Sequence, residues 1–339
     1  RAVLLLRGWS VPPKTKFAAA KWLYATLFGI SLIATWVLRD WAATEFAQHI
    51  GEVSAYCKSA SDVTSCAAGQ IAMRISFANF CFFSLHFVVL LGMKSESDVR
   101  VDVHAGAWAL KLLLWVGALI GFFWMPTTAV YGYAKAARIL SSLFLVVQLV
   151  LIIHLFYEVN EWLVSKDTRA SWAMLVSGAI VGFGLGLAAI GIAYHLYALS
   201  PSCRLNIFFC TFSLLVGLAL VAILFVPGRT ATAGLLTSGA VFLYCSYLLL
   251  SSLSSQPPDQ DCVRGGGVSP RWIQIVGFFI ALGTVLYSTV TAGVASKDMF
   301  GNKHDDSTDG LLPYRADFFH LVFALASMYI AMLFSNWQV

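Results

Sequence analysis

Charge is scarce in this 339-residue sequence: Lys, Arg, Asp and Glu make up 12% of it, whereas hydrophobic residues make up 59%. A soluble protein needs more polar surface than this to cover its core, so the composition excludes a soluble globular class. Proline is scarce too, with nine residues. Apolar runs therefore continue long enough to cross a bilayer as helices.

Catalytic motifs are missing as well. The sequence has no Gly-x-Ser-x-Gly elbow, no His-Glu-x-x-His pair and no glycine loop followed by Lys-Ser/Thr. No set of His, Cys and carboxylate residues has the spacing of metal ligands. The sequence therefore predicts no enzyme activity, no cofactor and no metal, and the net charge of +5 indicates membrane topology before it indicates nucleic-acid binding.

Nine apolar runs fill most of the chain. Each is about 20 residues long and lacks the alternation of a barrel strand, so we predict an all-α, polytopic transmembrane helical bundle. We treat residues 1–339 as one integral membrane domain, with extramembrane loops at 39–70 and 296–317. The predicted spans are 17–38, 71–93, 107–125, 137–157, 171–198, 205–226, 233–253, 272–295 and 318–337.

Basic residues are unevenly divided between the loops on the two sides of the membrane. If the loops are assigned by parity, twelve Lys and Arg residues lie on the side of the N-terminus and seven on the other. Because positive charge stays in the cytoplasm, we expect a cytoplasmic N-terminus. Residues 39–70 would then be lumenal or extracellular, and residues 296–317 cytoplasmic.

Four cysteines fall in loops on the side away from the N-terminus: Cys57, Cys66, Cys203 and Cys262. Disulfides persist on that side of a membrane. The simplest pairing is Cys57 with Cys66 and Cys203 with Cys262, and four free thiols is the alternative. In the fifth span, Gly178, Gly182 and Gly186 recur every four residues, a spacing that lets a neighbouring helix approach closely in lipid.

Polar residues inside apolar spans are the main candidates for a functional site, because they are costly there. His154 and Glu158 are four residues apart and share a helix face. They form a proton- or cation-responsive site or a polar track for lipid headgroups, or they mark a helix end at the cytoplasm. Arg74 and Lys111 bind a lipid phosphate or a buried carboxylate, or they extend to an interface. The full set of candidates is Arg74, Lys111, Gln148, His154, Glu158, Asn160 and Glu161.

Several stretches, in order, resemble one family. They run from Met73 to Ala78, from Lys94 to Arg100, from His104 through Lys111, from Gln148 to Glu161, from Gly234 to Cys262, and from Phe318 to Trp337. Together they cover most of the chain. They resemble the serine incorporator family, with plant and protist members the most similar.

The resemblance implies a eukaryotic membrane protein of ten helices, with two helical subdomains joined by a long tilted helix, for which 137–157 is the candidate. It also implies lipid handling, either as serine supply for phosphatidylserine and sphingolipid synthesis or as non-selective phospholipid scrambling, in an endomembrane or plasma membrane. Phospholipids or sphingolipids are the expected partners, and a homo-oligomer also fits. The alternatives are an accessory subunit of a larger membrane complex and, more weakly, an amino-acid carrier.

Overall fold

The computed structural model describes residues 13–60, 62–198, 200–223, 226, 234–256, 262, 279, 282–287, 291, 312–335 and 337. In this part of the chain seven helices are long and apolar enough to cross a membrane, and one further apolar helix is shorter. The predicted polytopic helical bundle is therefore confirmed. Most of the predicted span at 272–295 and of the predicted loop at 296–317 lies outside the described residues.

The segment predicted as a loop at 39–70 is largely helical. After α1 (Pro13–Trp41) come the short helices α2 (Ala43–His49) and α3 (Gly51–Cys57), and α4 (Val63–Leu90) begins well before the predicted span. Asp62 caps α4 by accepting hydrogen bonds from the backbone N–H groups of Thr64 and Ser65, which an N-terminal helix turn needs. Hydropathy detected only the apolar part of this helix.

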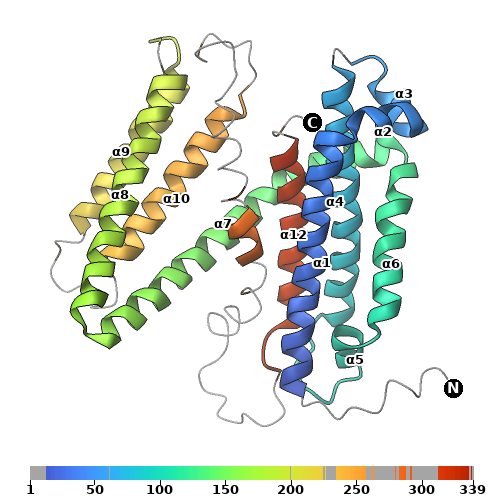
Figure 1. The fold of residues 1–339 in the computed structure, drawn as a ribbon, viewed down its shortest axis with the longest axis horizontal. Helices are drawn as coiled ribbons and strands as arrows, with labels where there is room; N and C mark the ends of the chain where they lie inside the picture. Colours follow the sequence, from blue (N-terminus) through green and yellow to red (C-terminus); the bar gives the residue numbers. More distant parts are fainter. Residues whose placement is uncertain are drawn as a thin grey trace. The chain divides into compact units, whose positions relative to one another are not determined.

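Contacts group the chain into two compact units, and unit 1 comprises residues 1–148 and 285–339. In unit 1, α4 packs against α1, α6 (Trp108–Gly121) and α12 (Ala316–Phe334) (Figure 1). The short helix α5 (Arg100–Ala105) precedes α6, and the 3-10 turn η2 (Phe122–Trp124) follows it. Because 78% of the most apolar window of α12 is buried, this helix forms the centre of the unit.

Helix α7 (Thr127–Lys166) has 40 residues, nearly twice the predicted span at 137–157. At 1.5 Å per residue it is about 60 Å long, roughly twice the thickness of the hydrocarbon core. It belongs to unit 1 through Gln148 and to unit 2 from Leu149 onward. Residues 158–166, which we predicted to be outside the span, are thus a continuation of the helix.

Unit 2 comprises residues 149–284 and contains α8 (Arg169–Tyr197), α9 (Arg204–Ile223) and α10 (Leu235–Ser254). The glycine stripe of α8 faces α10. A Cβ atom on Gly182 would lie 2.8 Å from the backbone of Gly239, and one on Gly186 would lie 2.6 Å from the ring of Phe242. A Cβ atom on Gly178 would likewise lie too close to the side chain of Leu236. The close helix approach expected from the glycine spacing is therefore present.

Two disulfides constrain the segments next to the helices α3, α4 and α9. Cys57 is bonded to Cys66, and Cys203 is bonded to Cys262, which is the simplest pairing that the loop positions suggested. The first joins α3 to the first turn of α4, and the second holds the residue that precedes α9. Cys81, Cys210 and Cys245 are free thiols.

Candidate functional site

A group of buried polar side chains lies where α1, α4, α5, α6 and α12 meet in unit 1. We call it the histidine cluster. Each of its side chains comes from a different part of the chain, and each residue is less than one-tenth exposed. In a region surrounded by apolar helices, such a group requires internal partners. The cluster consists of Tyr24, His86, His104, Lys111, Tyr314 and His320.

The backbone between α5 and α6 positions two members of the cluster. Helix α5 ends at Gly106, where a Cβ atom would lie 2.7 Å from the carbonyl oxygen of Asp102. Ala107 then adopts a left-handed conformation with φ of 52°, which few side chains favour. This turn brings Lys111 back over the preceding helix, so that its Nζ donates to the carbonyl oxygen of His104 at 2.8 Å.

A hydrogen-bond chain runs through His104. Its Nδ1 lies 3.1 Å from Nε2 of His320, and its Nε2 lies 2.8 Å from the hydroxyl oxygen of Tyr314. That hydroxyl donates to the carbonyl oxygen of Phe17 at 3.1 Å. These hydrogen bonds therefore connect the start of α1 with α5, with the segment before α12, and with α12 itself.

The hydroxyl group of Tyr314 has a single hydrogen, and this hydrogen sets the direction of the whole series of hydrogen bonds. If Tyr314 donates to Phe17, it must accept from Nε2–H of His104, and Nδ1 of His104 must accept from Nε2–H of His320. The series of hydrogen bonds then ends at Nδ1 of His320, which is buried and has no hydrogen-bond partner among the described residues. The opposite direction would leave a buried donor at that atom and remove the bond to Phe17, so the first direction satisfies more groups.

Electrostatics keep His104 neutral. Burial and, secondly, the ammonium group of Lys111 lower the pKa of His104 to about 3, because both disfavour a second positive charge. Burial also raises the pKa of the Tyr314 hydroxyl. His104 and Tyr314 thus exchange hydrogen bonds as uncharged groups at neutral pH.

Lys111 is the cation of the cluster, and it has no ion pair with a carboxylate in the described part of the chain. Its Nζ lies 4.4 Å from the ring centroid of Trp108 and 5.2 Å from that of Tyr24. Aromatic faces stabilise a desolvated ammonium group. Lys111 therefore does not extend to an interface.

The histidines do not form a metal centre. His86 stacks on His320 with ring centroids 5.0 Å apart and an interplanar angle of 27°, and Nδ1 of His86 contacts the carbonyl oxygen of Phe82. Among the described residues, no group of three potential ligands is placed to hold a metal ion.

Arg74 is also fully buried, and its guanidinium group donates hydrogen bonds to other groups of the protein. One of its Nη atoms donates to the carbonyl oxygens of Phe122, Phe123 and Met125, and the other donates to the Thr127 hydroxyl. These carbonyls belong to η2 and to the turn that leads into α7, where helix-end acceptors lack partners. Arg74 therefore caps a helix end.

The candidate residues on α7 divide among three faces of the helix. His154 and Glu158 lie on one face, with Nδ1 of His154 3.7 Å from a carboxylate oxygen of Glu158 and 63% of the Glu158 side chain exposed. Glu161 follows three residues later and is also exposed. Gln148 and Asn160 lie about 120° to either side of His154 and are buried.

The two buried amides differ in their surroundings. Asn160 packs against the start of α10, where a Cβ atom on Gly234 would clash with Oδ1 of Asn160. In the part of the chain that the structure describes, neither side-chain polar atom of Gln148 has a hydrogen-bond partner. The structure thus places His154, Glu158 and Glu161 on one face of α7, apart from Gln148 and Asn160.

Sequence reasoning missed most of the histidine cluster. His104 and His320 entered only as members of stretches that resemble the family. Tyr24 and Tyr314 carried no signal, because an isolated Tyr near an apolar span is common. The 216 residues that separate His104 from His320 explain why no local pattern joined them.

Comparison with known proteins shows the family of the chain. The family model described as serine incorporator (Serinc) matches residues 9–309 and 295–339. The chain belongs to the serine incorporator family. A probable serine incorporator of Dictyostelium discoideum is 27% identical, over 97% of this chain and 84% of the relative. Human serine incorporator 5 is 25% identical, over 87% and 84%.

A probable serine incorporator of Nematostella vectensis is also 27% identical, over 85% of this chain and 75% of the relative. Two of the stretches that suggested the serine incorporator family meet in unit 1. His104 and Lys111 come from one of them and His320 from another, and all three meet in the histidine cluster. The chain is accordingly a multi-helix membrane protein of this family.

Proposed function

We propose that this serine incorporator family member handles lipids without catalysing a reaction, and that it moves phospholipids non-selectively between leaflets. The supply of serine to phosphatidylserine and sphingolipid synthesis, which the family name suggests, is the related possibility. The observation that carries the proposal is the exposed carboxylate of Glu158 beside the half-buried imidazole of His154 on a membrane-spanning helix.

An exposed charge in a spanning helix costs at least a few kcal/mol if lipid tails surround it. The cost falls if lipid headgroups or water contact it. His154, Glu158 and Glu161 extend over seven residues of α7, which is about 10 Å along the helix axis. A zwitterionic headgroup carries both an ammonium group and a phosphate. The carboxylates on this face of α7 suit the ammonium group, and the imidazole of His154 suits the phosphate.

Transbilayer movement in liposomes tests this function. The purified chain is reconstituted with fluorescent phosphatidylserine or phosphatidylcholine, and the outer leaflet is quenched chemically. We expect loss of the protected inner-leaflet signal for both lipids without ATP. A flat trace from correctly inserted protein would contradict lipid movement and favour the accessory-subunit alternative.

The role of the α7 face needs a matched pair of variants. The double variant His154→Leu with Glu158→Leu should move lipid at least fivefold more slowly than the wild type. The control, Val146→Leu with Val150→Leu, changes two exposed apolar residues of the same helix at the same spacing and should keep the wild-type rate. Equal rates in all three folded proteins would remove His154 and Glu158 from the mechanism.

We further propose that the N-terminus lies in the cytoplasm of a eukaryotic endomembrane or plasma membrane. The excess of basic residues supports this orientation. So does the arrangement of unit 1, since Tyr314 contacts Phe17 and Leu312 contacts Lys94 at the end where α1 begins, while α2 and α3 lie at the other end (Figure 1). Protease access to an N-terminal tag in sealed vesicles tests it.

A further inference from the structure

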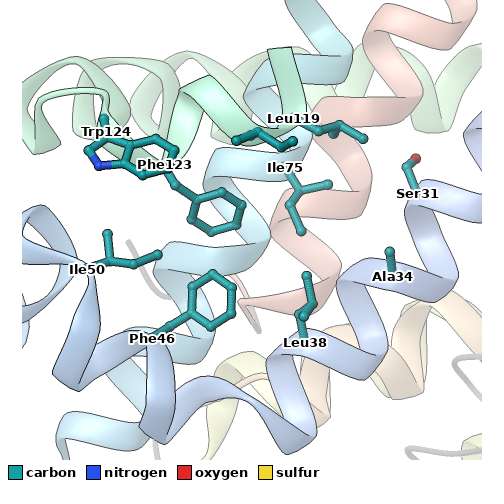
Figure 2. A pocket seen from close by; sticks show the side chains of 10 residues that line it. Ser31, Ala34, Leu38, Phe46, Ile50, Ile75, Leu119, Phe123 and Trp124 are labelled. Atoms are coloured by element: carbon teal, nitrogen blue, oxygen red, sulfur yellow. The ribbon is translucent and has the colours of Figure 1, made fainter. Parts of the chain in front are cut away.

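Unit 1 contains an apolar pocket of about 340 Å³ between α1, α2, α4, α6 and η2. This volume lies within the usual range for ligand sites, about 300 to 1,000 Å³. Figure 2 shows Ala34 and Leu38 of α1 on one side of the pocket and Phe46, Phe123 and Trp124 on the other. The histidine cluster lies at the opposite end of the unit, near the start of α1, and the pocket is separate from it.

The lining offers almost nothing to a polar ligand. Ser31 contributes the one hydroxyl among the lining residues, and that hydroxyl already donates to the carbonyl oxygen of Phe28 at 2.7 Å. The remaining lining side chains are apolar or aromatic. A headgroup, an amino acid or an ion would lose its hydration inside this pocket without gaining partners.

The position of the pocket matches one leaflet. Ser31 and Leu38 are seven residues apart on α1, so the pocket extends about 10 Å along the helix, within half of a hydrocarbon core of roughly 30 Å. At its rim Ile120 is 54% exposed and Trp124 is 68% exposed. Exposed Trp residues concentrate at the membrane–water interface, and Trp41, 77% exposed at the end of α1, marks the same level.

We propose that this pocket holds one acyl chain of a phospholipid from the leaflet on the side of the Cys57–Cys66 disulfide. An unfilled space between packed helices costs free energy that rises with its volume. Lipid tails are the medium around these helices, and they carry no polar group that the pocket would leave unpartnered. This site is independent of the proposed lipid movement, because it retains a tail and does not involve α7.

Photolabelling in liposomes tests the proposal. The probe is phosphatidylcholine with a diazirine in the middle of one acyl chain, and labelled peptides are identified by mass spectrometry. We expect residues 119–124 to be labelled at least fivefold more than the exposed face of α9. The variant Ala34→Phe fills the pocket and should reduce that labelling at least fivefold, whereas Ala19→Phe, on an exposed part of α1, should leave it unchanged.

Other outcomes would overturn the proposal. Equal labelling of 119–124 in the wild type and in folded Ala34→Phe would mean ordinary contact with surrounding lipid. Preferential labelling by a photoreactive sterol, with phosphatidylcholine excluded, would assign the pocket to a ring system instead. If Ala34→Phe does not fold, Leu119→Ala replaces it, and this enlarged pocket should at least double the labelling of Phe46 and Trp124. Lipid movement is measured separately and does not decide the result.

Discussion

Lowering the pH from 7 to 5 should destabilise unit 1 through His104. The pKa of this buried imidazole is lowered from 6.5 to about 3 in the folded protein, so the unfolded chain takes up a proton that the folded chain does not. The stabilising effect is complete above pH 6.5 and is lost as the pH falls toward 3. Linkage of the two pKa values gives a loss of about 2 kcal/mol between pH 7 and pH 5.

The assay is thermal unfolding in detergent, followed by tryptophan fluorescence at several pH values. About 2 kcal/mol corresponds to a few degrees in Tm. The variant His104→Gln should be less stable than the wild type at pH 7, and the difference should shrink by about 2 kcal/mol at pH 5, because Gln does not titrate. The control His49→Gln, at an exposed histidine with 73% of its side chain accessible, should keep the wild-type pH dependence. Parallel curves for His104→Gln and the wild type would refute the reasoning.

Three further variants test the packing of the two units by denaturation in detergent. Gly182→Ala forces a methyl group against the α10 backbone and should cost about 1 to 3 kcal/mol, whereas Gly184→Ala, with open space around its Cβ position, should be nearly neutral. Arg74→Met removes the donors to three carbonyls and should cost about 2 to 4 kcal/mol, and a neutral result would contradict the capping role. Cys203→Ser opens a loop that spans 59 residues of sequence separation and should cost about 4 kcal/mol; if Cys262→Ser differs from it strongly, the disulfide is not the cause.

Local patterns were sufficient to predict the spanning helices that the structure describes, because each spanning segment must satisfy its own backbone hydrogen bonds in lipid; they missed the short helices α2 and α3. The glycine spacing of α8 predicted close packing for the same reason: small residues at every fourth position form a groove whatever the partner. Helix ends were harder. The cap at Asp62 was visible in the sequence, but hydropathy weighs only apolar residues and therefore placed the start of α4 too late.

The sequence by itself determined that this chain is a helical membrane protein, and the order and spacing of its motifs identified the family. Only the tertiary structure decided which polar residues meet. Arg74 and Lys111 looked alike as isolated cations in apolar spans, yet one caps η2 and the other joins His104. Such contacts join residues far apart in the chain, and their energies depend on burial and orientation, which helical periodicity does not encode.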